Sequence, residues 1–343
     1  MIWFLIAATG IWFAGRHFGI GWVPRWILIG LLYLTFLVTQ LMLAVQTPGA
    51  GYWETMQSML TMGGLLIAVL AYAWGVRWLK SHSVSPPEPK TKGSFQATEL
   101  ERYARHIMLR EIGGPGQKKL KNAKVLVVGA GGLGSPVLMY LAAAGVGTIG
   151  VIDDDAVEAT NLQRQIAHTD GRIGMPKVFS AEEAMKALNP YVKVRPYHRR
   201  LGPEIVADLV ADYDLVLDGT DNFATRYLVN AACVAAKKPL ISAALTQWEG
   251  QISVFDPAHG APCYQCVFPE APAAGLAPSC AEAGVAGPLP GVVGAMMAVE
   301  AVKVITGAGE ALAGRMMIYD ALYAETRVIG LQRRADCEIC REA

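Results

Sequence analysis

The pattern of hydrophobic and polar residues divides the chain into two parts. Up to about residue 80 the apolar residues form long continuous runs, whereas from residue 96 onward short apolar segments alternate with polar ones. Residues 26–46 and 57–79 each contain a charge-free run close to the ~20 residues that cross ~30 Å of hydrocarbon. Residues 1–15 are also uncharged but span only ~22 Å as a helix. We therefore expect two to three transmembrane helices at these places.

Basic residues set the expected orientation of these helices, because loops rich in Lys and Arg stay in the cytoplasm. Arg16 and Arg25 flank the first loop, the second loop has no basic residue, and Arg77 and Lys80 follow the last run. Three crossings then place the C-terminal part of the chain on the cytoplasmic side of the inner (cytoplasmic) membrane. No ionisable residue interrupts the two long runs, which favours an anchor over a transport or sensing role.

A segment rich in Pro, Ser and Lys follows the anchor at residues 81–95 and has no apolar face to bury. We expect a flexible linker there, between an anchor at residues 1–80 and a globular domain at residues 96–343. A cleaved signal peptide is the alternative for residues 1–15. The absence of a basic segment before that run argues against this alternative.

The stretch KVLVVGAGGLGSPVLMYLAAAG has the order strand, glycine turn, helix. Gly129, Gly131 and Gly134 form the pattern G-x-G-x-x-G, which typically binds the phosphates of a nucleotide at the helix N-terminus. Ser135 is the expected N-cap of the helix, and Gly145 is the expected stop. From this turn alone, a nicotinamide or flavin oxidoreductase would be the default interpretation.

The next apolar segment, TIGVID, predicts a second strand that ends in Asp153, where an acid of this fold grips the ribose hydroxyls. Further apolar strands follow in DLVLD, PLISAAL, QISVFD and MMIYDAL, with helical stretches between the earlier ones. This alternation predicts an α/β fold with a Rossmann-like, doubly wound, mainly parallel sheet. The later strands have little helix between them, so we expect them to extend the sheet in antiparallel pairing.

A polar cluster after Asp153 changes the functional interpretation. It consists of Asn161, Gln163 and Arg164, followed by Lys177 in IGMPK. Hydride transfer develops no new charge on the phosphates and needs no such cluster. Attack on a phosphorus does need it, because fixed cations stabilise charge on the transferring and leaving groups. The cluster therefore favours chemistry at phosphorus over redox chemistry.

Carboxylates also follow the strand in LVLDGTDN, at the edge of the sheet where ligands bind. Asp221 is suited to hold Mg²⁺ on a triphosphate, with Asn222 beside it. For Asp218 we favour a structural role as a helix N-cap.

Four of the six cysteines form two Cys-x-x-Cys pairs, Cys263 with Cys266 and Cys337 with Cys340. Four thiolates are enough for a closed tetrahedral zinc site that would hold the C-terminus against the body of the domain. A redox pair is the alternative. Cys233 lies in the helical pattern NAACVAAKK and is expected to be a small core residue.

The globular part resembles the MoeB and ThiF enzymes of the ubiquitin-activating-enzyme superfamily, and is slightly more similar to MoeB. The ordered motifs that carry the resemblance extend over residues 96–343: RYARHIMLREIGGPGQKKLKNAKVLVVGAGGLGSP, TNLQRQIAH, GMPKV, DGTDNFATR, EGQISVF, PCYQC, CAEAGVAGPLPGVVG and CEIC. The resemblance implies ATP-dependent adenylation of the C-terminal glycine of a ubiquitin-like sulfur carrier of the MoaD or ThiS kind, with release of pyrophosphate.

The resemblance also implies roles for single residues. It assigns nucleotide binding to Gly132, Asp153 and Asn222, phosphate binding to Asn161, Gln163, Arg164 and Lys177, magnesium to Asp221, and zinc to Cys263, Cys266, Cys337 and Cys340. Arg105 matches an arginine that enters the partner subunit's ATP site, so a homodimer is implied. Cys280 matches a position that holds the activated carrier in some relatives and is dispensable in MoeB-type enzymes; we leave both interpretations open.

The overall charge of the chain argues against a nucleic-acid partner. The formal net charge is +1, so no overall field attracts a nucleic acid. The chain ends at Ala343, directly after the second cysteine pair, and we expect sulfur to come from another protein. Alternatives to a MoaD-directed enzyme of molybdopterin synthesis are a ThiS-directed enzyme of thiamine-thiazole synthesis, a non-catalytic membrane scaffold that binds carriers, and a Rossmann oxidoreductase.

Overall fold

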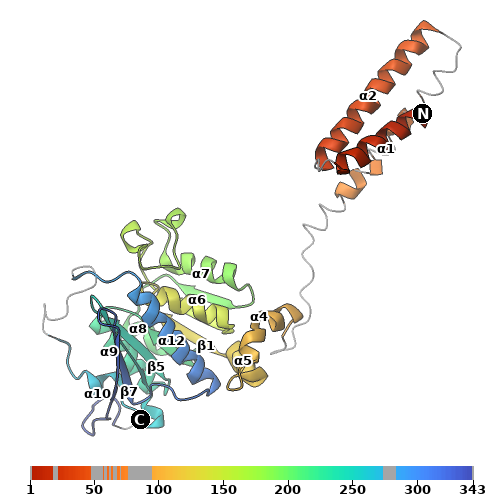
Figure 1. Cartoon of the computed structure of the whole chain (residues 1–343). Coiled ribbons are helices and arrows are strands. Elements are labelled where there is room, and N and C mark those ends of the chain that lie inside the picture. Colours follow the sequence, from red (N-terminus) through yellow and green to blue (C-terminus); the bar gives the residue numbers. More distant parts are fainter. Residues whose placement is uncertain are drawn as a thin grey trace. The chain divides into compact units, whose positions relative to one another are not determined.

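The computed structural model describes residues 2–17, 22–47, parts of 57–75, 95–272 and 283–341. It divides into two compact units, Met1–Pro89 and Lys90–Ala343, each of which is described here by itself (Figure 1). Every described residue between positions 57 and 75 is helical. Much of the span expected at residues 57–79, most of the linker at 81–95 and the whole of Cys280 lie outside the described residues.

The first unit contains α1 (Ile2–His17) and α2 (Trp22–Gln46), which pack against each other through Trp12 and Trp26. The guanidinium of Arg25 lies 5.5 Å from the centre of the Trp12 ring. Within α2, the segment Pro24–Leu43 has a mean hydropathy of 2.1 and no buried residue. By length and composition this helix is able to cross a membrane, and the predicted helix at residues 26–46 is confirmed as a helix.

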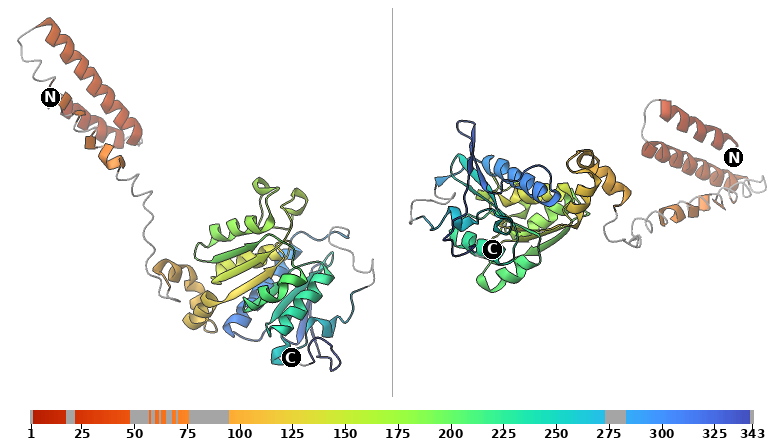
Figure 2. Two further views of the ribbon diagram at one scale, coloured as in Figure 1. Left: turned by 180° about the vertical axis from the view of Figure 1, so that it is seen from behind. Right: turned by 90° about the horizontal axis from the view of Figure 1, so that it is seen from below.

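The second unit is built on an eight-stranded sheet with the order β3-β2-β1-β4-β5-β6-β7-β8 (Figures 1 and 2). The strands are β1 (Lys124–Val128), β2 (Thr148–Ile152), β3 (Lys193–Tyr197), β4 (Leu215–Asp218), β5 (Leu240–Leu245), β6 (Glu249–Phe255), β7 (Arg315–Asp320) and β8 (Glu325–Gly330). Pairing is parallel from β3 through β5 and antiparallel from β5 through β8. The predicted mainly parallel sheet with an antiparallel extension is confirmed.

Helices cover both faces of this sheet, as a doubly wound fold requires. They are α4 (Ala97–Ile107), α5 (Gly113–Asn122), α6 (Gly134–Ala144), α7 (Lys177–Leu188), α8 (Pro203–Ala211), α9 (Phe223–Ala235), α10 (Tyr264–Val267) and α12 (Leu289–Thr306), with short 3-10 turns η1 (Ala159–Asn161), η2 (Asp170–Arg172) and η3 (Pro257–His259). One core joins α5, α6, α7 and α12 to the sheet, and the other joins α8, α9 and α10 to its opposite face. The helix α12 is apolar and long enough to cross a membrane, but half of it is buried, in the core that it shares with α5, α6 and α7.

The local structure of the glycine turn corrects one expectation. The helix α6 begins at Gly134 with Leu133 at the N-cap position, so Ser135 lies inside the first turn and is not the N-cap. A side chain at position 134 would collide with the carbonyl oxygen of Gly129, which explains why the helix begins on a glycine. The predicted stop is confirmed, because Gly145 adopts the left-handed conformation with φ 83°.

Candidate active site

A pocket of about 1130 Å³ opens at the C-terminal ends of β1, β2 and β4. This is the place where the strand order reverses between β1 and β4, and doubly wound sheets bind ligands at such a point. Leu133, Lys177, Phe223 and Pro290, at the N-terminal ends of α6, α7, α9 and α12, line the pocket. The unpaired N–H groups and the dipoles of these helices favour an anionic ligand.

The structure brings most of the predicted nucleotide-binding residues together in this pocket. The pocket is lined by Gly129, Gly131, Gly132, Asp153, Arg164, Lys177, Asp221 and Asn222. Four predicted residues do not line it: Gly134, Asn161, Gln163 and Arg105. Arg105 is exposed on α4.

Backbone N–H groups hold the carboxylate of Asp153 in place. Its Oδ2 accepts a hydrogen bond of 2.7 Å from the N–H of Ala130, and its Oδ1 accepts one of 2.8 Å from the N–H of Asp155. Burial raises the pKa of Asp153, while these hydrogen bonds and the charge of Lys177 oppose the rise. The carboxylate therefore ties the end of β2 to the glycine turn.

Lys177 is a buried cation at the first position of α7. Its side chain is 5% exposed, and its Nζ lies 2.6 Å from Oδ2 of Asp155, whose side chain is 66% exposed. The sequence analysis did not single out Asp155. A carboxylate that balances a buried ammonium beside a pocket could have been suspected from the run of three aspartates, but which of the three faces the lysine depends on the fold.

Arg164 is held in position by the turn that precedes it. Its guanidinium donates to Oδ1 of Asn161 at 2.8 Å and to the carbonyl of Thr160 at 3.4 Å. A Cβ at Gly132 would lie 3.1 Å from Cβ of Pro290 and 3.7 Å from Cδ of Arg164. The absence of a side chain at position 132 therefore lets Arg164 and the start of α12 approach the glycine turn. Asn161 acts here by orienting the arginine.

The loop after β4 corrects a second expectation. The N-cap of α9 is Asn222, whose side chain accepts a hydrogen bond from the N–H of Thr225, so Asp218 is not the cap. Asp218 is fully buried and accepts hydrogen bonds from the N–H and the hydroxyl of Thr220. Asp221 is exposed and lines the pocket.

Arg226, in the first turn of α9, is a buried cation beside this loop that the sequence analysis missed. Its side chain donates to the carbonyls of Thr220 and Ala243 and, at 3.3 Å, to the hydroxyl of Ser242. Ser242 in turn donates to Asp218 at 3.3 Å. Because Thr220 directly precedes Asp221, Arg226 fixes the backbone that carries the exposed carboxylate. The motif DGTDNFATR contains this arginine, but nothing in the motif indicated that its side chain is buried.

An unpaired polar atom also marks the pocket as a ligand site. Gln165 is 5% exposed and lines the pocket, and its Oε1 has no hydrogen-bond partner among the described residues. A buried polar atom without a partner is costly. A bound nucleotide, with its hydroxyl and amino groups, is the kind of ligand that would satisfy it.

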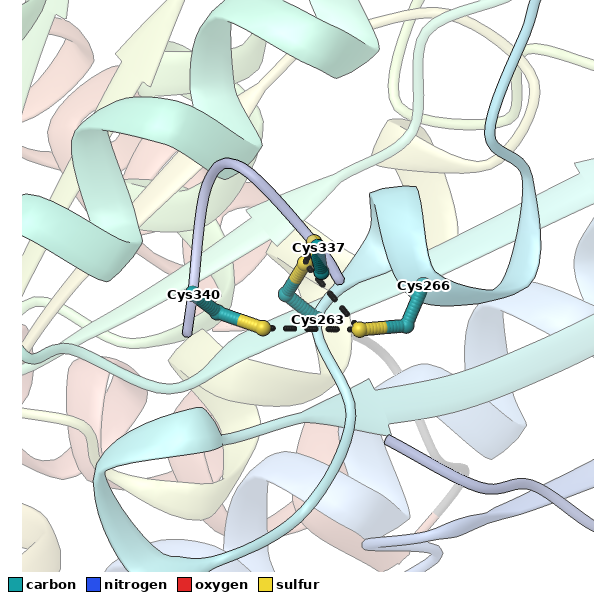
Figure 3. A group of neighbouring side chains, drawn as sticks. All are labelled: Cys263, Cys266, Cys337 and Cys340. Carbon is teal, nitrogen blue, oxygen red and sulfur yellow. Dashed lines mark hydrogen bonds between the residues drawn. The ribbon is translucent and has the colours of Figure 1, made fainter. Parts of the chain in front are cut away.

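The second site is the cysteine cluster, in which all four sulfur atoms lie within 4.8 Å of one another (Figure 3). The sulfur pairs Cys263 and Cys266, Cys263 and Cys337, and Cys266 and Cys340 are 3.8, 3.6 and 3.4 Å apart. Four sulfurs at about 2.3 Å from one zinc ion would be about 3.8 Å apart. The cluster is buried and could hold a metal ion of this kind.

Electrostatics also favour a cation among these sulfurs. Burial raises the pKa of Cys263. Burial acts on Cys337 in the same direction, but the N–H groups of Cys340 and Ile339 donate to its sulfur and the pKa of Cys337 falls to about 7. Crowded buried thiols cannot all ionise without a compensating positive charge. The four cysteines together are therefore suited to bind a metal ion. Cys233 lies outside this cluster and is 2% exposed in the core, as predicted.

Comparison with known proteins identifies the family of the chain. Residues 103–339 match the ThiF family. The chain belongs to the ThiF family. The resemblance on which the sequence analysis relied is therefore confirmed.

Several relatives are about half identical to this chain over some 70% of its length. A sulfur carrier protein adenylyltransferase of Thermus thermophilus is 50% identical over 246 residues, which cover 71% of this chain and 91% of that protein. A probable adenylyltransferase/sulfurtransferase, MoeZ of Mycobacterium tuberculosis, is 49% identical over 251 residues, which cover 72% of this chain and 64% of that protein. The SAMP-activating enzyme E1 of Haloferax volcanii is 47% identical over 249 residues, which cover 73% of this chain and 92% of that protein.

Solved structures share the fold. A crystal structure of E. coli MccB with MccA-N7isoASN superposes with a TM-score of 0.62 at 25% identity, covering 70% of this chain and 74% of that chain. A crystal structure of PaaA gives a TM-score of 0.62 at 20% identity, covering 86% of this chain and 90% of that chain.

Proposed function

We propose that this ThiF-family enzyme is an adenylyltransferase that activates the C-terminal glycine of a ubiquitin-like sulfur carrier protein and releases pyrophosphate. Two relatives that are about half identical to it are named a sulfur carrier protein adenylyltransferase and a probable adenylyltransferase/sulfurtransferase. The observation that carries the proposal is the convergence of Arg164 and Lys177 with the glycine turn in one pocket. Hydride transfer to or from a nicotinamide would not require these two cations.

The chemistry follows from the charges in the pocket. The terminal carboxylate of the carrier attacks the α-phosphorus of ATP, the bond from that phosphorus to the bridging oxygen breaks, and pyrophosphate leaves. Arg164 and Lys177 offset the negative charge that develops on the transferring and leaving groups. No general base is required, since a carboxylate is already ionised at pH 7.

The pocket has room for both reactants. Its volume of about 1130 Å³ exceeds the ~300–1,000 Å³ of most sites for one small ligand. The nucleotide is expected at the glycine turn, between Asp153 and Asn222. The carrier tail is expected at the ends of β5 and β6, where Ala244, Thr246 and Gln251 line the pocket.

Mg²⁺ and zinc are part of the proposal. Asp221 would hold Mg²⁺, which when bound would neutralise part of the triphosphate charge. Its exposed carboxylate beside the anion pocket fits that role. The four cysteines would hold zinc in a structural role, because all are buried and a closed four-sulfur site leaves no position for substrate.

The cellular context is proposed as well. We infer that the first unit anchors the enzyme in the cytoplasmic membrane, with the catalytic unit facing the cytoplasm. The apolar, unburied helix α2 supports this inference. The exposed Arg105, which does not line the pocket of its own subunit, supports a homodimer in which it serves the pocket of the partner.

For the substrate we favour a carrier of the MoaD class, and hence molybdopterin synthesis; a ThiS-class carrier of thiamine-thiazole synthesis is the second candidate. Carrier-dependent exchange between ATP and labelled pyrophosphate tests both. We expect exchange with the MoaD-class carrier and its loss in Arg164→Ala and Asp221→Ala. Arg110→Ala, at an exposed position whose side chain pairs only with its neighbour Glu111, is the control and keeps full exchange. Exchange with neither carrier, or undiminished exchange in both site variants, would refute the proposal.

A further inference from the structure

His168 is a buried histidine with both ring nitrogens engaged, in the loop between η1 and η2. It is 6% exposed and does not line the pocket. Its Nε2 lies 2.9 Å from the carbonyl oxygen of Ala130, and its Nδ1 lies 2.9 Å from Oγ of Ser180. The chemistry proposed above gives this residue no part.

The partners of His168 determine its tautomer. A carbonyl oxygen only accepts hydrogen bonds, so Nε2 carries the proton and donates it to Ala130. Nδ1 then has a lone pair and accepts from the hydroxyl of Ser180. The ring is neutral in this arrangement. In agreement, burial lowers the pKa of His168, and the charges of Lys177 and Arg172 lower it further. The hydrogen bond to Ala130 and the charge of Asp153 oppose this shift but do not cancel it.

The two hydrogen bonds connect two parts of the phosphate-binding site that are otherwise separate in the sequence. Ala130 is the second residue of the glycine turn, and its N–H donates to Asp153. Ser180 is fully buried in the first turn of α7, which begins with Lys177. His168 therefore lies between the turn that receives the phosphates and the helix that presents the phosphate-binding lysine.

We propose that His168 is a positioning residue that sets the separation between the glycine turn and Lys177, and so tunes the affinity for ATP. The inference rests on the proposed function of the pocket. With its carbonyl oxygen held by Nε2 of His168 and its N–H held by Asp153, both peptide groups of Ala130 are fixed. Loss of the Nε2 bond leaves the Ala130 carbonyl buried without a strong donor, since its other hydrogen bond among the described residues comes from the hydroxyl of Ser135 at 3.4 Å.

Two near-isosteric substitutions separate the two bonds. In His168→Gln the side-chain amide reaches the position of Nε2 and still donates to Ala130. In His168→Asn the shorter amide reaches only the position of Nδ1, so that it keeps Ser180 and loses Ala130. We expect the dissociation constant and the KM for ATP to rise about tenfold or more in His168→Asn, and to stay close to wild type in His168→Gln.

The experiment uses the full chain purified in detergent. Equilibrium dialysis with labelled ATP gives the dissociation constant, pyrophosphate exchange gives KM and kcat, and a thermal melt reports the fold. His259→Gln is the matched control, because this exposed histidine pairs with Asp256 and neither residue lines the pocket. A lower melting temperature in His168→Asn with unchanged ATP affinity would mean a purely structural role and would overturn the proposal, as would equal ATP affinities in the Asn and Gln variants.

The binding measurement keeps this inference separate from the proposed activity. If the wild-type chain binds ATP but exchanges pyrophosphate with neither carrier, adenylation of these carriers is refuted. The comparison of ATP dissociation constants between the two His168 variants still decides the role of His168 in that case.

Discussion

Nζ of Lys177 lies 2.6 Å from Oδ2 of Asp155, so a carboxylate neutralises the buried lysine of the proposed phosphate site. The lysine side chain is 5% exposed and the aspartate 66% exposed, so the aspartate has more room to change its conformation than the lysine. An incoming triphosphate would take the place of Asp155 as the main counter-charge. Asp155 would thus balance the charge of Lys177 before ATP binds.

This pairing predicts a partial rescue. Lys177→Met should weaken ATP binding by on the order of 100-fold, because a charge-assisted contact is lost and Asp155 then stands uncompensated beside an anion site. Adding Asp155→Asn should recover several-fold of that loss by removing the repulsion. Equilibrium dialysis with labelled ATP measures both variants. A double variant that binds no better than Lys177→Met would show that Asp155 exerts no repulsion on the phosphates.

The cysteine cluster predicts a metal that stabilises the fold. We expect about one zinc ion per chain in the reduced, purified protein, measured by elemental analysis. Cys340→Ser should lose the metal and lower the melting temperature by on the order of 10 °C, because the C-terminal segment is then no longer held to α10.

Cys233 provides the control for this test. It is 2% exposed and lies in a different core cluster from the four sulfurs. Cys233→Ala should therefore keep its zinc and lose only a small part of its stability. Equal zinc content in Cys340→Ser and the wild type would rule out a four-sulfur metal site.

The sequence predicted those parts of the fold in which local pattern and tertiary environment agree. The strands β1 and β2 are apolar because both of their faces are buried, and Gly145 ends α6 because only a residue without a side chain takes its φ of 83° easily. The strands β3 and β8 were missed. KVRPY contains a proline and lies at one edge of the sheet, and every residue of β8 at the other edge is exposed, so neither has the apolar run of a central strand.

The site was predicted to the extent that its residues lie in recognisable motifs. Arg164, Lys177 and Asp221 line one pocket, as their residue types suggested. His168 and Arg226 were not found, because their partners are fixed only by tertiary structure: Ala130 lies 38 residues from His168 in the chain. Asp218 was assigned a cap because aspartate commonly caps helices, and the structure instead gives that role to Asn222.

The buried histidine predicts a pH dependence of stability. The pKa of His168 is lowered in the folded state, whereas an unfolded histidine titrates near about 6.5. Above that pH neither state is protonated and the contribution of the neutral ring is fully present. As the pH falls below about 6.5, the unfolded chain binds a proton that the folded chain resists, so stability is lost until the folded-state pKa is passed.

His168→Gln isolates this effect because glutamine does not titrate. Thermal melts at pH 7.5 and pH 5 should show a larger fall for the wild type than for His168→Gln. The contribution of Asp153, whose pKa is raised by burial, is present in both proteins and largely cancels in the difference. Parallel curves for the two proteins would mean that His168 keeps an ordinary pKa when folded.

Arg226 predicts a loss of stability that a conservative change does not repair. Its fork donates to two backbone carbonyls and a hydroxyl while the nearby Asp218 is fully buried. Arg226→Ala should cost about 2–5 kcal/mol, since it leaves two carbonyls without their donor at about 1–3 kcal/mol each. Arg226→Lys keeps the charge but cannot span all three acceptors. Urea unfolding measures both, and a loss below about 1 kcal/mol in Arg226→Ala would contradict this account.

The first unit predicts how the protein partitions between membrane and solution. In α2 the apolar side chains Leu31, Leu34 and Val45 are about half exposed or more within this unit, at 55%, 55% and 67%. Exposed apolar surface of this kind is costly in water and is stabilised in hydrocarbon. We expect the full chain to stay with membranes through an alkaline carbonate wash, and residues 90–343 alone to remain in the supernatant. A Leu31→Lys, Leu34→Lys double variant should release part of the full chain, because each lysine near the middle of a span costs about 2.5–3.5 kcal/mol. Recovery of the wild-type full chain in the supernatant would show that the helices serve protein contacts rather than an anchor.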